Sequence, residues 1–264
     1  MNKRNALKLI VGITLVPLAQ GASAQISTAT AINRAARFRA LSQRCAKAYG
    51  QQLLEVMPDN AREIQATAQK LIQGGFEELG KAGFSADNAR LLAAVQQDAS
   101  ALTVLLTRAP TRDGVVAVSG QADKMLAAAN RLTEAIESGA KLGSAKLINL
   151  AGRQRMLSQR MAKNYFLVAA GLDAKPVREQ LASDRVEFKQ AVAQLHAAPI
   201  STPVIRNELQ LAEAQWTFFE AAINRKPDAD ALRNVATTSE RLLEVMNGLT
   251  VHYESALKDL LGTS

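Results

Sequence analysis

Cysteine and histidine are scarce in this 264-residue chain. With one cysteine, Cys45, the chain cannot form an internal disulfide, and we expect a small buried apolar side chain there; a reactive or intermolecular thiol is the alternative. His196 and His252 have no cysteine or carboxylate cluster at metal-binding spacing, so we predict no metal site. Ser42 and Ser158 have no histidine at a spacing that suits a hydrolase, and no glycine-rich phosphate loop is present. The sequence therefore predicts no catalytic residue, no cofactor and no enzymatic activity.

Long apolar runs are also rare, and the one that is present lies at the N-terminus. Residues 9–18 are apolar, basic residues precede them, and a small-residue cleavage site ends at Ala24. We therefore expect residues 1–24 to be a signal peptide cleaved after Ala24, and the mature protein to be soluble in the periplasm. An uncleaved N-terminal anchor is the alternative. No second run of about 18 apolar residues follows, so we do not expect the processed protein to be transmembrane.

The charge distribution gives no sign of a nucleic-acid partner. The net charge of +8 falls to +5 without Lys3, Arg4 and Lys8, and charges of both signs are spread along the chain. No run of Lys and Arg is interleaved with aromatic residues, as a nucleic-acid-binding surface would require. No helix concentrates basic residues opposite a bulky apolar face, which argues against docking on acidic lipid.

Aromatic residues make up only 4% of the chain, whereas 48% of the residues are apolar and alanine and leucine are abundant. This composition favours helices packed through aliphatic side chains. We expect the local aromatic cluster of Trp216, Phe218 and Phe219 to lie in the core. Prolines and glycines divide the mature chain into eight predicted helices. The expected breaks lie at Pro58, Gly83, Pro110, 138–144, Gly171 to Pro176, Pro199 to Pro203, and Pro227.

Two stretches of 18 residues are near copies of each other. The first box, Ile32–Tyr49, reads INRAARFRALSQRCAKAY, and the second box, Ile148–Tyr165, reads INLAGRQRMLSQRMAKNY; 12 of the 18 positions are identical at an offset of 116. The last predicted helix of each half also repeats, because Asn130-x-Leu132-Thr133 matches Asn247-x-Leu249-Thr250 at an offset of 117. The chain is therefore a tandem repeat, and we predict domains at 25–140 and 141–264.

Each half should fold as an up-down-up-down four-helix bundle. Because four is an even number, the chain returns to the end where it started, and the short linker at 138–144 lets the second box helix run parallel to the first. The predicted fold class is thus all-α, with two tandem four-helix bundles paired through their first helices.

Both boxes keep arginines five residues apart, Arg39 with Arg44 and Arg155 with Arg160. At about 100° per residue, Arg155 shares a helix face with small residues such as Gly152, and Arg39 does the same in the first box. Two arginines facing each other at about 6 Å would repel by about 3 kcal/mol at an effective dielectric constant of about 20. A small anion between them would reverse that effect, and a planar guanidinium matches a planar oxyanion. The alternatives for this pair are a salt bridge to Asp or Glu, or simple exposure.

The pattern Asn149-x-Ala151-Gly152-x-x-Arg155-Met156-x-Ser158-x-Arg160 resembles the box that opens the periplasmic sensor domain of nitrate/nitrite sensor histidine kinases. It equally resembles the N-terminal domain of type IV pili methyl-accepting chemotaxis transducers (PilJ-type). The resemblance implies a four-helix sensor domain that holds nitrate or nitrite between arginines of two boxes. The ligand-binding residues carried over are Arg39, Arg155, Gly152, Ala36, Asn149 and Asn33. Four further residues are expected to support the ligand-binding residues or to act in signalling: Arg44, Arg160, Ser158 and Ser42. For the two arginines, the alternative is a position on a solvent-exposed helix face.

The chain departs from the resembled receptors in two ways. Ala36 stands where the second box has Gly152, which makes the two sides of the predicted site unequal. No transmembrane helix or signalling domain is predicted after the second repeat, so a partner such as a membrane-bound sensor or transducer would have to read the ligand-bound state. The competing interpretation is a non-sensory helical adaptor that docks on a membrane receptor or on a pilus or chemotaxis component.

Overall fold

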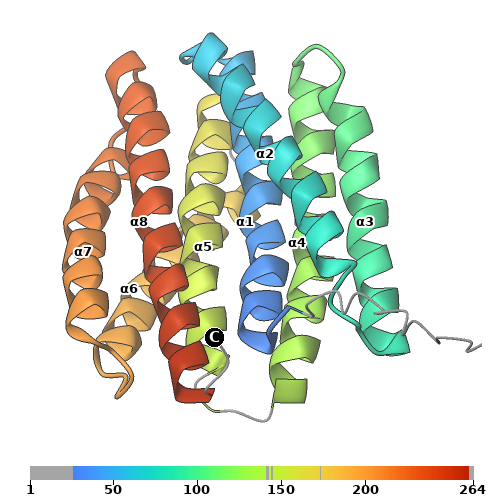
Figure 1. Cartoon of the computed structure of the whole chain (residues 1–264). Coiled ribbons are helices and arrows are strands. Elements are labelled where there is room, and N and C mark those ends of the chain that lie inside the picture. Colours follow the sequence, from blue (N-terminus) through green and yellow to red (C-terminus); the bar gives the residue numbers. More distant parts are fainter. Residues whose placement is uncertain (1–25, 141–142, 144, 173, 262–264) are drawn as a thin grey trace, which may run out of the picture.

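The computed structural model describes residues 26–140, 143, 145–172 and 174–261, and all regular secondary structure in them is helical (Figure 1). The predicted signal peptide and its cleavage site lie outside the described residues. The helices are α1 (Thr28–Leu53), α2 (Pro58–Leu79), α3 (Ala86–Leu106), α4 (Arg112–Ala140), α5 (Ala145–Ala169), α6 (Lys175–His196), α7 (Pro203–Ile223) and α8 (Ala229–Leu261).

The helix ends follow the capping chemistry of the sequence. Ser27 and Thr202 accept hydrogen bonds from backbone N–H groups in the first turns of α1 and α7. Prolines occupy the first turn of α2, α6 and α7, where a missing N–H is not needed. Gly83 and Gly171 adopt positive φ angles of 61° and 71° just beyond α2 and α5, a conformation that glycine reaches without steric cost.

The duplication is preserved in the helix positions. The helices α2, α3 and α4 begin at residues 58, 86 and 112, and α6, α7 and α8 begin at residues 175, 203 and 229, which is 117 residues later in each case. Within each half, the box helix packs on the second and fourth helices, and the third helix packs on the fourth. Each half is therefore built on the same plan.

The two bundles meet through their box helices. In Figure 1, α1 and α5 run side by side in the middle, α4 and α8 flank them, and α3 and α7 lie at the two outer edges. The helix pairs α1–α5, α1–α8 and α4–α5 make contact, so a pseudo-twofold axis runs between the box helices. The predicted fold class is confirmed: it is all-α, with two four-helix bundles paired through their first helices.

Most of the aromatic residues and the single cysteine lie in the core, whereas Phe218 is exposed. Cys45 is fully buried, as expected, and burial raises the pKa of its thiol to about 12. Trp216 and Phe219 are buried, and Trp216 stacks on Phe188 with ring centroids 4.3 Å apart. The expectation that Phe218 belongs to this cluster is wrong, because its side chain points outward from α7 and is 63% exposed.

Candidate functional site

Arg39 and Arg155 lie where α1 and α5 pack together, and both are almost completely buried, at 1% and 2% exposure. Gly152 marks the closest approach of the two helices. A Cβ atom at Gly152 would lie 3.0 Å from Nη2 of Arg155, 3.1 Å from Cβ of Ala36 and 3.7 Å from Nη2 of Arg39. Both guanidinium groups therefore reach the same point, one from each box helix.

Arg39 is held by two asparagines from other helices. Its Nη1 donates to Oδ1 of Asn130 on α4 at 2.9 Å. Its Nη2 donates to Oδ1 of Asn149 on α5 at 2.8 Å, and to the backbone oxygen of the same residue at 3.3 Å. The Nε contact with the carbonyl of Ala36 is longer, at 3.4 Å. Two short hydrogen bonds thus fix this guanidinium across the α1–α5 contact.

Arg155 has the symmetry-related partners but holds them more loosely. Its Nη1 donates to Oδ1 of Asn247 on α8 at 3.4 Å, and its Nη2 donates to the backbone oxygen of Asn33 at 3.3 Å. The Nε contact with the carbonyl of Gly152 measures 3.5 Å. Oδ1 of Asn33 is buried and has no hydrogen-bond partner among the described residues, whereas the equivalent atom of Asn149 accepts from Arg39. The guanidinium of Arg155 is therefore held by longer hydrogen bonds than that of Arg39.

Two carboxylates lie close to the positive charges of Arg39 and Arg155, each separated from the guanidinium groups by an asparagine. The side-chain amide of Asn149 donates to Glu137 at the end of α4, and that of Asn33 donates to Oε2 of Glu254 on α8 at 2.5 Å. Among the described residues, no carboxylate forms an ion pair with Arg39 or Arg155. Neither a direct salt bridge nor solvent exposure, the two alternatives for these arginines, is observed.

Burial strongly affects the basicity of both arginines. Desolvation lowers the pKa of Arg39 to about 9, with a further lowering from the charge of Arg153. The pKa of Arg155 is likewise lowered to about 9 by desolvation, and then by Arg37 and Arg39. Both values lie above neutral pH, so two like charges face each other in the interior of the protein.

The four residues predicted to support the site point elsewhere. Ser42 and Ser158 donate to the backbone oxygens of Arg39 and Arg155, both at 2.9 Å, and so bond within their own helices. Arg44 forms an ion pair with Glu240 on α8. Arg160 forms one with the fully buried Asp184 on α6, at 2.6 Å. These two arginines link helices and do not face the point beside Gly152 at which Arg39 and Arg155 meet, which we call the convergence point.

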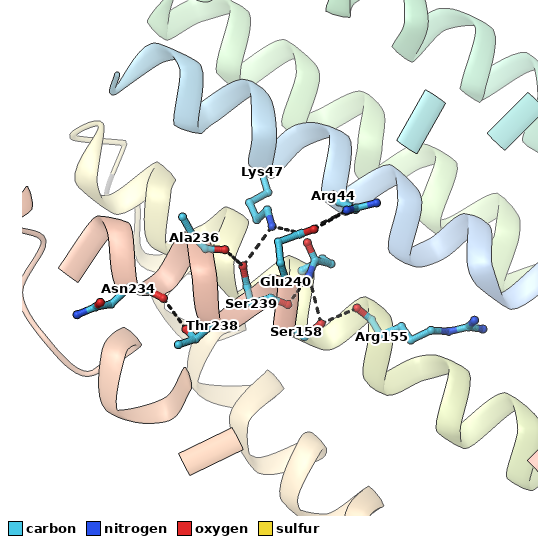
Figure 2. A network of polar contacts seen from close by, with 10 residues as sticks. Arg44, Lys47, Arg155, Ser158, Asn234, Ala236, Thr238, Ser239 and Glu240 are labelled. Atoms are coloured by element: carbon cyan, nitrogen blue, oxygen red, sulfur yellow. Dashed lines mark hydrogen bonds and ion pairs between the residues drawn. The ribbon is translucent and has the colours of Figure 1, made fainter. Parts of the chain in front are cut away.

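A second pair of buried cations was not predicted. Lys47 has a fully buried side chain and donates to Oγ of Ser239 at 3.1 Å and to Glu240 at 2.5 Å, and Figure 2 shows Lys47 and Arg44 directed at the same carboxylate. Lys163, at the equivalent position of the second box, pairs with Asp123 on α4 at 2.7 Å. Each lysine thus ties a box helix to the last helix of the other repeat. The repetition of this lysine in the two boxes was the available signal.

Asn130 and Asn247 were also missed as site residues. Both belong to the repeated Asn-x-Leu-Thr segment of the last helices, which predicted the duplication but not a role for the asparagines. Which face of α4 and α8 turns toward the box arginines depends on the packing of the whole bundle. Within the described ranges, no group of three or more His, Cys, Asp or Glu side chains is placed to hold a metal ion.

The fold and the buried polar contact define a tandem helical-bundle protein with a cationic centre between its repeats. Residues 136–241 match the family model of the type IV pili methyl-accepting chemotaxis transducer N-terminal domain (PilJ), which confirms the resemblance predicted from the second box. The match runs from the end of α4 to the middle of α8, so it includes Gly152 and Arg155. It relates this half of the chain to a sensory and signalling domain of chemotaxis transducers. No curated protein and no solved structure is significantly similar to the chain.

None of the helices that the structure describes is both long enough and apolar enough to cross a membrane.

Proposed function

We propose that this protein is an exported sensory protein that binds a small oxyanion, nitrate or nitrite, between Arg39 and Arg155. One observation carries the proposal: two buried guanidinium groups from different repeats converge beside Gly152, and their direct partners are neutral oxygens. The match of residues 136–241 to a transducer N-terminal domain supports a sensory role.

Electrostatics favours an anion at this point. Two guanidinium charges about 6 Å apart repel by about 3 kcal/mol at an effective dielectric constant of about 20. An anion that accepts from Nη2 of both arginines would replace this repulsion by two attractive charge-assisted hydrogen bonds. Nη2 of Arg155 would give up one hydrogen bond, of 3.3 Å to the backbone oxygen of Asn33, and breaking a bond of this length costs little. Nη2 of Arg39 would give up its bonds of 2.8 and 3.3 Å to Asn149.

The same bonds connect the proposed site to the helices that could carry a signal. Asn149 contacts Arg39 and Glu137, so redirecting Nη2 of Arg39 to an anion would loosen a link between α1, α5 and the end of α4. The resulting shift of α1 against α5 would be read by a partner such as a membrane-bound sensor or transducer. The coupling free energy available to such a shift is typically about 1–3 kcal/mol.

Nitrate or nitrite is expected to stabilise the protein by about 2.7 kcal/mol at 100 times the dissociation constant. Thermal unfolding with nitrate, nitrite, chloride and sulfate should show this selectively for the planar anions. Arg39→Lys and Arg155→Lys keep the charge but remove the planar fork, and each should abolish the increment. Arg62→Lys is the matched control, because this arginine is exposed and pairs with Asp59 on its own helix.

An adaptor without a ligand is the second candidate, and the carboxylates favour it. Glu137 and Glu254 balance the guanidinium charges through Asn149 and Asn33, so the polar network can also be a purely structural device. In that case no anion alters the unfolding temperature, and both lysine variants respond to nitrate as the wild type does. This result would reject the sensory proposal.

Exchanging the small residues at the convergence point should tune anion binding in opposite directions. Ala36→Gly removes the methyl group that lies 3.1 Å from the Cβ position of Gly152, so we expect about tenfold tighter binding and a loss of about 1 kcal/mol of stability. Gly152→Ala would add a second methyl group, 3.1 Å from Cβ of Ala36, and should block binding because both methyl groups then occupy the space between the arginines. Titration calorimetry of both variants measures the change.

The double variant Ala36→Gly/Gly152→Ala is the control for these two substitutions. It keeps one methyl group at the contact but moves it to the other side of the pseudo-twofold axis. Binding close to that of the wild type is expected if the space between the arginines decides affinity. Loss of binding in all three variants would show instead that the packing of the helices has been disturbed.

A further inference from the structure

The helix α7 is apolar on two faces, and only one of them is covered. Its buried face packs into the second bundle through residues such as Leu209, Trp216 and Phe219. On the opposite face Val204, Leu211 and Phe218 are 54%, 53% and 63% exposed. We define the outer face of α7 as Val204, Asn207, Leu211, Ala214, Phe218 and Ala221, all of which are exposed.

The spacing on this outer face is that of a coiled coil. Val204, Leu211 and Phe218 are seven residues apart and take the a positions, while Asn207, Ala214 and Ala221 take the d positions. Scattered exposed apolar residues are ordinary, but three consecutive heptads in one line on a single helix face are not.

The duplication provides an internal comparison for this face. The equivalent positions on α3, 117 residues earlier, are Asp87, Arg90, Ala94, Gln97, Ala101 and Val104. Half of these residues are polar, Asp87 and Arg90 form an ion pair, and Val104 is the one bulky apolar residue among the six. In Figure 1, α3 and α7 occupy opposite outer edges of the molecule. The apolar outer face is thus a property of α7 and does not follow from its place in the repeat.

We propose that the outer face of α7 pairs with the same face of a second copy of this chain, with the two helices antiparallel. In an antiparallel pair each a residue lies opposite a d residue of the other copy, so Leu211 meets Ala214, Val204 meets Ala221, and Phe218 meets Asn207. Every large side chain then faces a small one, and the helices keep a constant distance. A parallel pair would set phenylalanine against phenylalanine and alanine against alanine, with unequal layers.

The residues that flank the outer face fit a homotypic contact. Of Glu208, Gln210, Gln215 and Thr217, only Glu208 is charged, so two copies approach without marked repulsion and nothing selects an oppositely charged partner. The arrangement is isologous and closes as a dimer with twofold symmetry. It does not involve Arg39 or Arg155, so it is independent of the proposed anion site.

The dimer is expected to be weak and dependent on concentration. A helix of 21 residues is about 31 Å long, and pairing along one such helix buries less area than a standard interface. Sedimentation velocity of the wild type from about 10 μM to about 1 mM detects dimers whose dissociation constants lie in this range. A monomer throughout this range overturns the proposal.

Substitutions and cross-linking test which face is used. Leu211→Glu and Phe218→Glu should both give monomers, while Ala101→Glu, at the α3 position equivalent to Phe218, should leave the dimer intact. A mixture of Leu211→Cys and Ala214→Cys proteins should form a disulfide-linked heterodimer faster than either protein links to itself. Cys45 is fully buried and does not compete. Self-linking of Leu211→Cys at the faster rate, or a dimer that survives both glutamate variants, contradicts the antiparallel pairing.

Discussion

Replacing Glu240 by glutamine is expected to lower the free energy of unfolding by about 3–5 kcal/mol, the usual cost of breaking a buried ion pair from one side. Glu240 accepts from Lys47, whose side chain is fully buried, and from Arg44, whose side chain is 15% exposed. The substitution keeps the shape of the side chain and one acceptor oxygen, but it leaves the buried ammonium of Lys47 without its counter-charge. Urea unfolding at neutral pH measures the loss.

The pH dependence of stability should change with the same substitution. Burial alone would raise the pKa of Glu240, but Lys47 and Arg44 together lower it to about 2. Because the carboxylate is more acidic in the folded than in the unfolded protein, its contribution is complete above about pH 4.5 and is lost as the pH falls toward 2. It amounts to about 3 kcal/mol at neutral pH, and Glu240→Gln should remove this part of the acid sensitivity.

Asp123→Asn is the matched control, since Asp123 holds Lys163 at the equivalent place in the other repeat. Its side chain is 52% exposed, whereas that of Glu240 is 22% exposed, so water can replace part of the interaction. We expect a loss of about 1 kcal/mol. Equal losses for the two variants would mean that burial does not decide the strength of these pairs.

Replacing Arg39 by alanine is expected to cost about 3 kcal/mol of stability in the absence of added nitrate, and replacing Arg155 by alanine about 1–2 kcal/mol. Both substitutions remove the same side-chain volume and relieve the same mutual repulsion, so their difference reports the hydrogen bonds. Arg39 makes two bonds of 2.8 and 2.9 Å to the side chains of the half-buried Asn130 and Asn149, and its removal leaves both oxygens without this donor. The closest partner of Arg155 is at 3.3 Å.

Denaturant unfolding of the two variants, with circular dichroism to verify the helical fold, measures this difference. Arg34→Ala serves as a control, since this arginine lies on α1 outside the convergence point and pairs with Glu78. If Arg155→Ala proves the more damaging substitution, the unequal bonding of the two arginines does not determine stability.

The sequence predicted the helices and their pairing because both follow from local rules and from repetition. Prolines and glycines placed the breaks, and the repeated box identified Arg39 and Arg155 as a facing pair. The carboxylate partners could not be predicted, because they depend on which residues the other helices happen to offer. Arg160 reaches Asp184 on α6, but the residue 117 positions earlier is Thr67, so Arg44 pairs with Glu240 instead.

The exposure of Phe218 was missed for a related reason. An aromatic residue two positions from Trp216 and next to Phe219 reads as part of one cluster, but neighbouring positions on a helix point about 100° apart. Trp216 and Phe219 turn toward the bundle, whereas Phe218 points outward from α7. Sequence proximity on a helix is therefore a poor guide to a shared core position.

The arginine of each repeat is held by an asparagine from the other repeat, so neither half contains a complete centre. Two identical subunits would have to keep both sides of such a centre alike, since one gene encodes both. Joining them in a single chain removes that constraint. The two sides here differ accordingly: Ala36 lies opposite Gly152, and Arg39 makes short hydrogen bonds where those of Arg155 are long. In a fused pair of this kind, a ligand bound at the centre can cause an asymmetric movement, in which the helices of one bundle shift and those of the other stay in place.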